Sequence, residues 1–345
     1  MRKKRIFLLC ITMFLLFSIL FLNSWGRRKK AKLPKGPAFN SVLYPVPDEG
    51  KVKPLKKSSK PIKIAVLGLE NNPFWIPVKG GTQKAAEELK SYNCTVDWIN
   101  AGAQHTTDVF SQAIEAAMVQ KYDAIACIAG EAGIVPFINK AVDAGIPVAT
   151  FNSETKSKNE RLFFVGADSY VQGQTAGEAM VKLLNGKGKV AIITGFFAVE
   201  AHEERRKGFV DYIKKNSDIE IVGEVENKDK GDIAYNQAQD FMNAHPDLSA
   251  IYVTAGGPFG AAKAVEDAGK TGKVKMITYD FVDETMMFVK KGVITGTIGQ
   301  DPYAQGHDPA IRLFNYLVSG EVPPAAKLLT RADLVTKENM ADFGF

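Results

Sequence analysis

The chain has 345 residues, of which 46% are hydrophobic and 24% are charged, a composition typical of a globular protein with about two domains. Its formal net charge of +6 is unevenly distributed, because residues 1–61 hold 15 Lys and Arg against two acids, whereas residues 62–345 hold 29 basic and 36 acidic side chains. The body is therefore acidic. It lacks the basic composition that a nucleic-acid-binding domain needs, and we expect no nucleic-acid partner.

The first 30 residues predict a membrane signal anchor. An apolar run of 17 residues, IFLLCITMFLLFSILFL, lies between the basic clusters MRKKR and RRKK, at the short end of a membrane span. No small-x-small cleavage site precedes RRKK, which favours an uncleaved anchor over a cleaved signal peptide or a core helix. Cys10 lies inside the run, so a lipoprotein cysteine is not indicated. We expect a single span in the cell membrane, with the N-terminus inside and the body on the extracytoplasmic side.

Residues 31–61 predict a stalk. This segment holds six prolines, several lysines and few large apolar side chains. Such a composition favours an extended, semi-rigid spacer rather than a packed element.

From Ile62 onward, short Val- and Ile-rich runs alternate with longer amphipathic segments such as 74–90, 107–120 and 133–144. The runs that predict strands are IAVLGL, CTVDWINA, DAIACIA, PVATFN, LFFVGAD, KVAIITG, IEIVGEV, AIYVTA, VKMITYD and ITGTIGQ. Continuous apolar strands separated by helices are typical of parallel sheets covered on both faces. We therefore expect an α/β protein with two doubly wound, Rossmann-like lobes.

Ligands of doubly wound sheets bind beyond the carboxyl ends of the strands. The residues expected there are amides, carboxylates, aromatic rings and an arginine, a set that suits polyhydroxy compounds. Asp280 could accept two hydroxyl protons and Arg205 could donate to sugar oxygens, while Phe74 or Trp75 could stack on the C–H face of a sugar. The alternative for both rings is packing between helix and sheet. Gly80 and Gly81 are expected to allow a close helix–sheet approach.

The sequence shows no catalytic constellation. The histidines His105, His202, His245 and His307 are scattered, and there is no G-x-S-x-G elbow or P-loop lysine. The segment GGPFGAA could hold an anion at a helix N-terminus, but we interpret it as a cleft loop. Cys94 and Cys127 match no metal or disulfide pattern and are expected to be buried thiols. We expect a protein that is not an enzyme and has no metal and no cofactor.

The body, from about residue 62 to 330, resembles the ribose-type periplasmic sugar-binding proteins, whose ligand domains also occur in lactose-repressor relatives. The matching segments, in order, are NNPFW, AGIPVATFN, ERRKGF, NAHPDLSAIYV, MITYD and GTIGQDPYAQG. The resemblance implies two lobes joined by a hinge of three crossings, near Gly166–Asp168, Gln300–Asp301 and Ala326–Thr330. The N-terminal lobe would comprise 62–167 plus 301–330, and the C-terminal lobe 168–300 plus 331–345.

The resemblance also implies the sugar contacts. The positions carried over or standing in for family contacts are Asn72, Phe74, Trp75, Asn152, Ser153, Arg205, Thr254, Asp280 and Gln300. The family's Asp-Arg pair is Asn152-Ser153 here, its Asn after the third strand is Ala129, and its later Asn-Asp is replaced within Thr254–Gly257. These differences favour a sugar other than ribose, such as a xylose-like pentose, a hexose or a less hydroxylated ligand. Replacement contacts could come from Glu131, Glu200 or Asp229.

Two functional classes remain open. The first is an anchored sensory subunit that binds sugar and docks a membrane histidine kinase, as some Gram-positive relatives do. The second is the substrate-binding receptor of an ABC sugar importer, which delivers the sugar to a permease. A delivery receptor is typically released or held by a lipid, so the uncleaved anchor and the stalk favour the sensor. The repressor class is not indicated, because no helix-turn-helix precedes the ligand domain.

Overall fold

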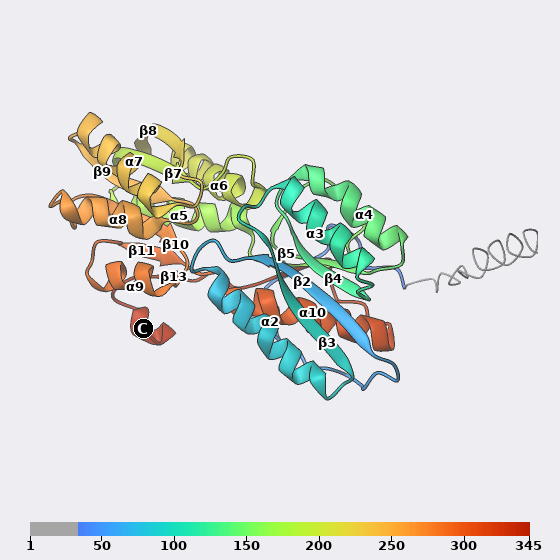
Figure 1. Ribbon diagram of the computed structural model, residues 1–345. Helices are drawn as coiled ribbons and strands as arrows, with labels where there is room; N and C mark the ends of the chain where they lie inside the picture. Colours follow the sequence, from blue (N-terminus) through green and yellow to red (C-terminus); the bar gives the residue numbers. More distant parts are fainter. Residues whose placement is uncertain (1–33) are drawn as a thin grey trace, which may run out of the picture. The chain divides into compact units, whose positions relative to one another are not determined.

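The computed structural model describes residues 34–345, and residues 35–345 form one compact unit. The expected signal anchor, residues 1–30, lies outside the described residues. Within residues 34–345, no helix combines the length and the apolar character that a membrane span requires. The compact unit contains two α/β lobes, each a β-sheet between two layers of helices (Figure 1). The expected two-lobe architecture is confirmed.

The sheet of the N-terminal lobe has seven strands, all parallel, in the order β1-β12-β6-β5-β4-β2-β3. Its strands are β1 (Val42–Leu43), β2 (Ile62–Leu69), β3 (Cys94–Gly102), β4 (Ala124–Ala129), β5 (Val148–Glu154), β6 (Phe163–Gly166) and β12 (Lys327–Leu329). Its helices are α2 (Trp75–Lys90), α3 (Thr107–Val119), η1 (Ala132–Ile134), α4 (Val135–Asp143) and α10 (Pro302–Ser319). Helices α2 and α10 pack together on one face, and α3 and α4 pack together on the other (Figure 1).

The sheet of the C-terminal lobe has six strands in the order β13-β11-β10-β9-β7-β8, of which only β13 is antiparallel to its neighbour. Its strands are β7 (Lys187–Thr194), β8 (Asp218–Glu226), β9 (Leu248–Val253), β10 (Lys275–Tyr279), β11 (Gly296–Ile298) and β13 (Leu334–Val335). Its helices are α5 (Ser169–Leu183), α6 (Glu200–Asn216), α7 (Gly231–Ala244), α8 (Pro258–Asp267), α9 (Asp283–Lys290) and η2 (Met340–Phe343).

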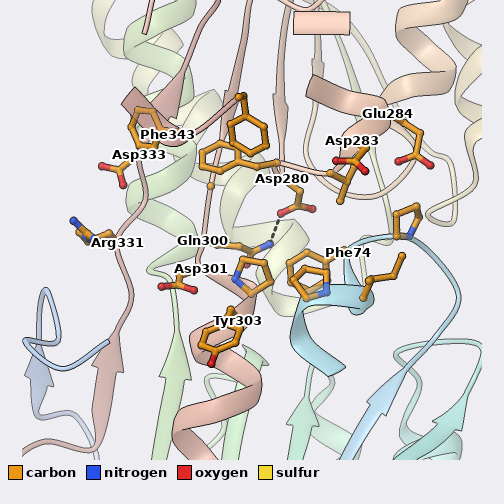
Figure 2. Close-up of a pocket in the computed structure, with 18 of the residues that line it drawn as sticks. Phe74, Asp280, Asp283, Glu284, Gln300, Asp301, Tyr303, Arg331, Asp333 and Phe343 are labelled. Carbon is orange, nitrogen blue, oxygen red and sulfur yellow. Dashed lines mark hydrogen bonds between the residues drawn. The ribbon is translucent and has the colours of Figure 1, made fainter. Parts of the chain in front are cut away.

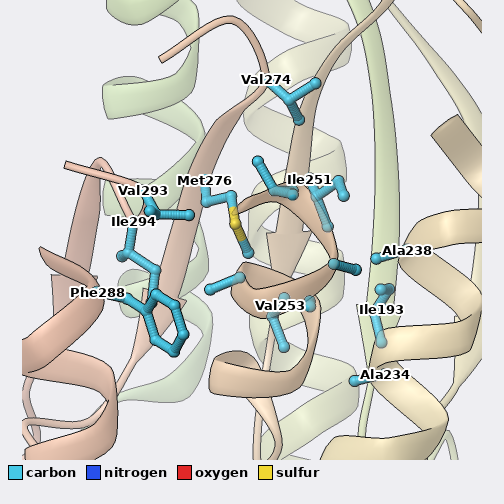
Figure 3. Packing of buried hydrophobic residues seen from close by; sticks show 14 of the residues in the cluster. Ile193, Ala234, Ala238, Ile251, Val253, Val274, Met276, Phe288, Val293 and Ile294 are labelled. Carbon is cyan, nitrogen blue, oxygen red and sulfur yellow. The ribbon is translucent and has the colours of Figure 1, made fainter. Parts of the chain in front are cut away.

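Each lobe has a core of its own because its parallel strands are apolar on both faces. In the C-terminal lobe, Ile251 and Val253 of β9 and Met276 of β10 meet Ala234 and Ala238 of α7 (Figure 3). On the opposite face, a second cluster joins the same strands to α5 and α6. Cys94 and Cys127 of the N-terminal lobe are buried free thiols, as the sequence predicted.

The chain passes between the lobes three times. Residues 167–168 connect β6 to α5, residues 299–301 connect β11 to α10, and residues 330–333 connect β12 to β13. Asp301 has a φ of 46° at the second crossing, and its side chain caps α10 by accepting from Ala304 N. Because each crossing leads from one lobe to the other, these three short segments form the covalent hinge between the lobes.

The prediction of a stalk is wrong for the part of residues 31–61 that the structure describes. Strand β1 pairs with β12, and Val46 and Val52 are buried against the N-terminal lobe. The backbone N–H of Leu55 donates to Oδ1 of Asn315 on α10 at 3.0 Å. The segment makes its contacts through a two-residue strand and through hydrogen bonds between backbone and side-chain groups. Such contacts leave no hydrophobic periodicity in the sequence, so the composition alone suggested a spacer.

Glycines set the distance between paired helices. A Cβ atom on Gly81 of α2 would lie 2.1 Å from the carbonyl oxygen of Tyr303, and one on Gly306 of α10 would lie 1.8 Å from that of Val78. The C-terminal lobe repeats this arrangement, because Gly173 of α5 and Gly208 of α6 each face a carbonyl of the other helix. Gly81 therefore allows a helix–helix approach rather than the helix–sheet approach expected from the sequence, and a Cβ on Gly80 would meet nothing within 4 Å.

Candidate functional site

The candidate site is a cleft between the two lobes, at the carboxyl ends of strands from both sheets. The lobes are closed on each other in this structure. Glu200 N donates to the carbonyl oxygen of Gly130 at 2.9 Å, and Lys156 of the N-terminal lobe pairs with Glu204 of the other lobe at 2.6 Å. The cleft cavity is lined by Asn72, Phe74, Trp75, His105, Asn152, Ala201, His202, Arg205, Asp229, Ala255, Gly256, Asp280 and Gln300.

The turn after β2 places two aromatic rings in the cleft. Asn72 Oδ1 accepts a hydrogen bond from Phe74 N at 3.0 Å, which fixes the turn that opens α2. The rings of Phe74 and Trp75 meet edge to face at 5.0 Å, and both side chains are buried. Nε1 of Trp75 is buried and has no hydrogen-bond partner within the described residues. An unpaired buried donor costs free energy, so a ligand acceptor at this position would be stabilising.

Arg205 is the central cation of the C-terminal side. Its guanidinium donates to Gln172 Oε1, to the carbonyl oxygen of Thr254 and to Gln300 Oε1, each at 3.0 Å. It also lies over the ring of Tyr279, 4.1 Å from the centroid. Because these partners belong to different elements, the network holds the charge in a fixed position between helix and strand ends.

Asp280 and Gln300 continue this network. Gln300 Nε2 donates to Asp280 Oδ1 at 2.7 Å (Figure 2). Burial raises the pKa of Asp280, and the nearby Arg205 opposes that rise. Asp280 has a φ of 73°, a conformation that Asp and Asn tolerate better than most residues. The hydrogen bond from Gln300 uses Oδ1 of Asp280, so within the described residues Oδ2 is left as an acceptor for a ligand hydroxyl.

Two histidines enter the cleft from opposite lobes. His105 follows β3, and its ring lies 5.5 Å from that of Trp75 and 5.8 Å from that of His202 on α6. Burial lowers the pKa of His105 to about 4 and that of His202 to about 3, so both imidazoles are neutral at pH 7. Nδ1 of His202 accepts from Phe196 N at 3.1 Å, and Nδ1 of His105 has no hydrogen-bond partner among residues 34–345.

Asp229 faces the histidine pair. Its Oδ1 accepts from Gly256 N at 2.9 Å, and its Oδ2 lies 3.8 Å from Nδ1 of His105. Burial raises the pKa of Asp229, and the nearby His105 opposes that rise. The sequence named Asp229 as a possible replacement contact, whereas it treated both histidines as scattered residues. The rule that ligands meet strand ends could have identified His105, because His105 lies just beyond the end of β3.

Seven of the nine site residues expected from the sequence line the cavity, and Ser153 and Thr254 do not. Ser153 is buried behind it, where its Oγ accepts from Ala201 N across the lobes at 3.2 Å. The Thr254 hydroxyl is paired with that of Thr194 at 2.7 Å. Among the possible replacement contacts, Glu131 binds the first turn of α3 through Thr107, and Glu200 lies 3.6 Å from Lys156.

The chemistry of the cleft is that of a binding site for a neutral polar molecule. Aromatic rings offer flat apolar faces, and the amides, imidazoles, carboxylates and guanidinium offer hydrogen bonds in both directions. Among residues 34–345, no group of three or more His, Cys, Asp or Glu side chains is arranged to hold a metal ion. The arrangement suits a ligand with a ring of hydroxyl groups.

The sequence and the fold match known proteins over most of the chain. The family model described as periplasmic binding protein domain matches residues 64–321. The xylose/arabinose-binding protein XylF of Sulfolobus acidocaldarius is 25% identical over 330 residues, covering 90% of this chain and 79% of the relative. The solved structure of GanP, a glucose-galactose binding protein from Geobacillus stearothermophilus, is 29% identical with a TM-score of 0.74, covering 81% of this chain and 99% of that chain. A chain of the XylFII-LytSN complex is 28% identical with a TM-score of 0.72, covering 83% and 99%.

Proposed function

Because the chain belongs to the periplasmic binding protein family, in its ribose-type sugar-binding branch, we propose that it is an extracytoplasmic receptor that closes on a monosaccharide and signals to a membrane sensor kinase. The observation that supports this most is the composition of the cleft, in which buried polar groups from both lobes surround Trp75 and Phe74. We propose a pentose of the xylose type as the ligand, and the expected signal anchor in residues 1–30 as the attachment to the membrane.

Closure is the proposed signal. A sugar that contacts Trp75 and His105 on one side and Arg205 and Asp280 on the other interacts with both lobes at once only when they are closed. The free energy by which the sugar favours the closed arrangement therefore cannot exceed the difference between its binding free energies for the closed and open states. On the C-terminal side, Arg205, Gln300 and Asp280 are held by hydrogen bonds within the protein, so these three side chains need little reordering when the sugar binds.

Two observations bear on the partner. The similarity to a chain of the XylFII-LytSN complex, together with the expected anchor, favours a sensor that stays beside a kinase. Similarity to ribose import binding proteins favours the second candidate, the receptor of an ABC sugar importer. We give preference to the sensor because an uncleaved anchor restricts the receptor to the neighbourhood of a membrane partner.

Ligand binding is tested by titrating the purified full-length chain with D-xylose, L-arabinose, D-ribose, D-glucose and D-allose in a calorimeter and in thermal unfolding. A sugar at 100 times its Kd stabilises the folded state by about 2.7 kcal/mol, and we expect the largest shift with a pentose. Absence of binding to every sugar would overturn the receptor proposal, and preference for a hexose would overturn only the pentose assignment.

An experiment in cells that lack the receptor distinguishes the sensor role from the importer role. If it is a sensor, sugar no longer induces transcription through the kinase, while uptake of labelled sugar by a constitutively expressed transporter stays normal. If it is an importer receptor, uptake is lost under the same constitutive expression.

A further inference from the structure

A second and larger pocket lies beside the hinge. Its volume is about 700 Å³, within the range of small-molecule sites, whereas the closed cleft retains about 30 Å³. The hinge pocket is lined by the first turn of α2, residues 280–284, the crossing 299–301 with Tyr303, residues 331–333 and the C-terminal Phe343 and Phe345. Figure 2 shows Asp283 and Glu284 on one side of it, and Arg331, Asp333 and Phe343 on the other. Phe74, Asp280 and Gln300 are shared with the cleft and form the wall between the two cavities.

Exposed apolar side chains gather in the hinge pocket. Ile76 is 72% exposed, Phe345 44%, and Tyr303 and Phe343 are each 37% exposed, although large apolar side chains are generally buried. The ring of Phe281 lies 5.9 Å from those of both Phe343 and Phe345, so these aromatic residues form one cluster. This aromatic cluster gives the hinge pocket an apolar face on which the body of a small ligand could pack.

The polar part of the lining is acidic. The carboxyl groups are those of Glu49, Asp280, Asp283, Glu284, Asp301 and Asp333, and the only cation in the lining is Arg331. Within the described part of the chain, the carboxylates of Asp283, Glu284 and Asp333 form no hydrogen bond or ion pair. These three are exposed at the rim, where their charges are not compensated.

Glu49 lies at the base of this lining. Its carboxyl group accepts from Arg331 N, with both oxygens at 3.2 Å, and its Oε2 lies 3.9 Å from Nε of Arg331. Burial and the neighbouring carboxyl of Asp301 raise the pKa of Glu49 to about 8, so its proton is retained at pH 7. The carboxylates that lack a partner among the described residues therefore lie at the rim, whereas Glu49 at the base is paired with Arg331.

We propose that the hinge pocket is a second binding site, which takes a small organic cation with an aromatic or aliphatic body. The apolar body would pack on the rings of Phe281, Phe343 and Phe345, whose faces also attract a positive charge. The cationic group would pair with Asp283 and Glu284. An anion is disfavoured by the acidic rim, and a neutral polyol would leave the apolar surface exposed.

The test uses 2-phenylethylammonium as the probe, with the purified full-length chain at pH 7, low ionic strength and no sugar. The matched controls are 2-phenylethanol, which has the same apolar body without the charge, and 3-phenylpropionate, which has the opposite charge. We expect calorimetric binding of the ammonium that is at least about tenfold tighter than that of either control. Equal binding of the ammonium and the alcohol, or no binding of the ammonium, would overturn the proposal.

Variants locate the site. Asp283→Asn combined with Glu284→Gln, and separately Phe343→Ala combined with Phe345→Ala, should each weaken binding of the ammonium about tenfold. These side chains are exposed, so both variants are expected to fold, which unfolding midpoints check.

The matched control, Glu87→Gln combined with Val119→Ala, changes an exposed acid and an exposed apolar residue elsewhere and should bind as the wild type does. Unchanged binding in both pocket variants would place the cation elsewhere. Because no sugar is present, failure of the sugar assignment leaves this result unaffected.

Discussion

Nδ1 of His105 lies 3.8 Å from Oδ2 of Asp229, and the two residues belong to different lobes. The distance is too long for a hydrogen bond, and Nδ1 has no hydrogen-bond partner elsewhere in the part of the chain that the structure describes. Both groups line the cleft, so a ligand hydroxyl between them could bond to both. A polar molecule that bonds to both groups would therefore connect the two lobes through this pair.

Replacing His105 by Phe should weaken sugar binding about fivefold, because it keeps an aromatic ring and removes one hydrogen bond to the ligand, worth about 1 kcal/mol. Calorimetric titration of the variant measures this. The control is His245→Phe at the C-terminal end of α7, outside the cleft, which should bind normally. A His105→Phe protein with wild-type affinity would show that the imidazole does not contact the ligand.

Replacing Asp280 by Asn should lower sugar affinity by roughly 10- to 100-fold, since hydrogen bonds to a charged group contribute about 1.5 to 3 kcal/mol. Asn tolerates the positive φ of this position, so the fold should be retained. Titration and thermal unfolding are compared with Asp240→Asn, which changes an exposed acid on α7. Undiminished binding by Asp280→Asn would remove this residue from the site.

The stability of the protein should fall as the pH rises from about 4.5 to 8, in part because of Glu49. Its pKa in the folded state is raised to about 8 by burial and by Asp301, so the folded state keeps a proton that the unfolded state has released. The contribution of the Glu49 proton to the free energy of unfolding is fully present below pH 4.5 and is lost as the pH passes 8. Glu49→Gln cannot release a proton, so urea unfolding should show a smaller loss in the variant. The same slope in both proteins would mean that Glu49 is ionised normally.

Gly81→Ala and Gly80→Ala should change stability in opposite directions. The new methyl of Gly81→Ala would lie 2.1 Å from a backbone oxygen of α10, so the helices must separate, at a cost on the order of 2 kcal/mol. The methyl of Gly80→Ala meets nothing within 4 Å, and Ala in a helix interior is favoured over Gly by roughly 0.5 to 1 kcal/mol. Urea unfolding compares the two. A Gly81→Ala protein as stable as Gly80→Ala would contradict the close packing of α2 on α10.

Most strands of the two sheets were predictable because they are Val- and Ile-rich runs between turn residues, continuous in central strands such as β4 and alternating with polar residues in β3 and β8. The exceptions, β1, β12 and β13, have two or three residues each, too few for any periodicity. Packing of residues 35–61 was not predictable either, because it depends on groups such as Asn315 that are distant in the sequence.

For residues such as Trp75, Arg205 and Asp280, a place in the site could be predicted from their positions near strand ends and from the family resemblance. Ser153 lies near the end of β5 and Thr254 directly follows β9, but their side chains turn toward partners inside the protein. His105 and His202 were missed because their proximity arises only when two lobes meet, which no single segment of sequence records.

The glycine contacts between α2 and α10 have a mechanical consequence. Helix α10 begins directly after the crossing 299–301, and α2 begins at Trp75 in the cleft. With backbone against backbone at Gly81 and Gly306, neither helix can slide or rotate against the other without a steric clash. The aromatic side of the cleft and the end of the crossing are therefore parts of one rigid body. Any opening of the lobes must be absorbed by the backbone torsions of the three crossings, 167–168, 299–301 and 330–333, so the aromatic rings turn through the same angle as the lobe that carries them.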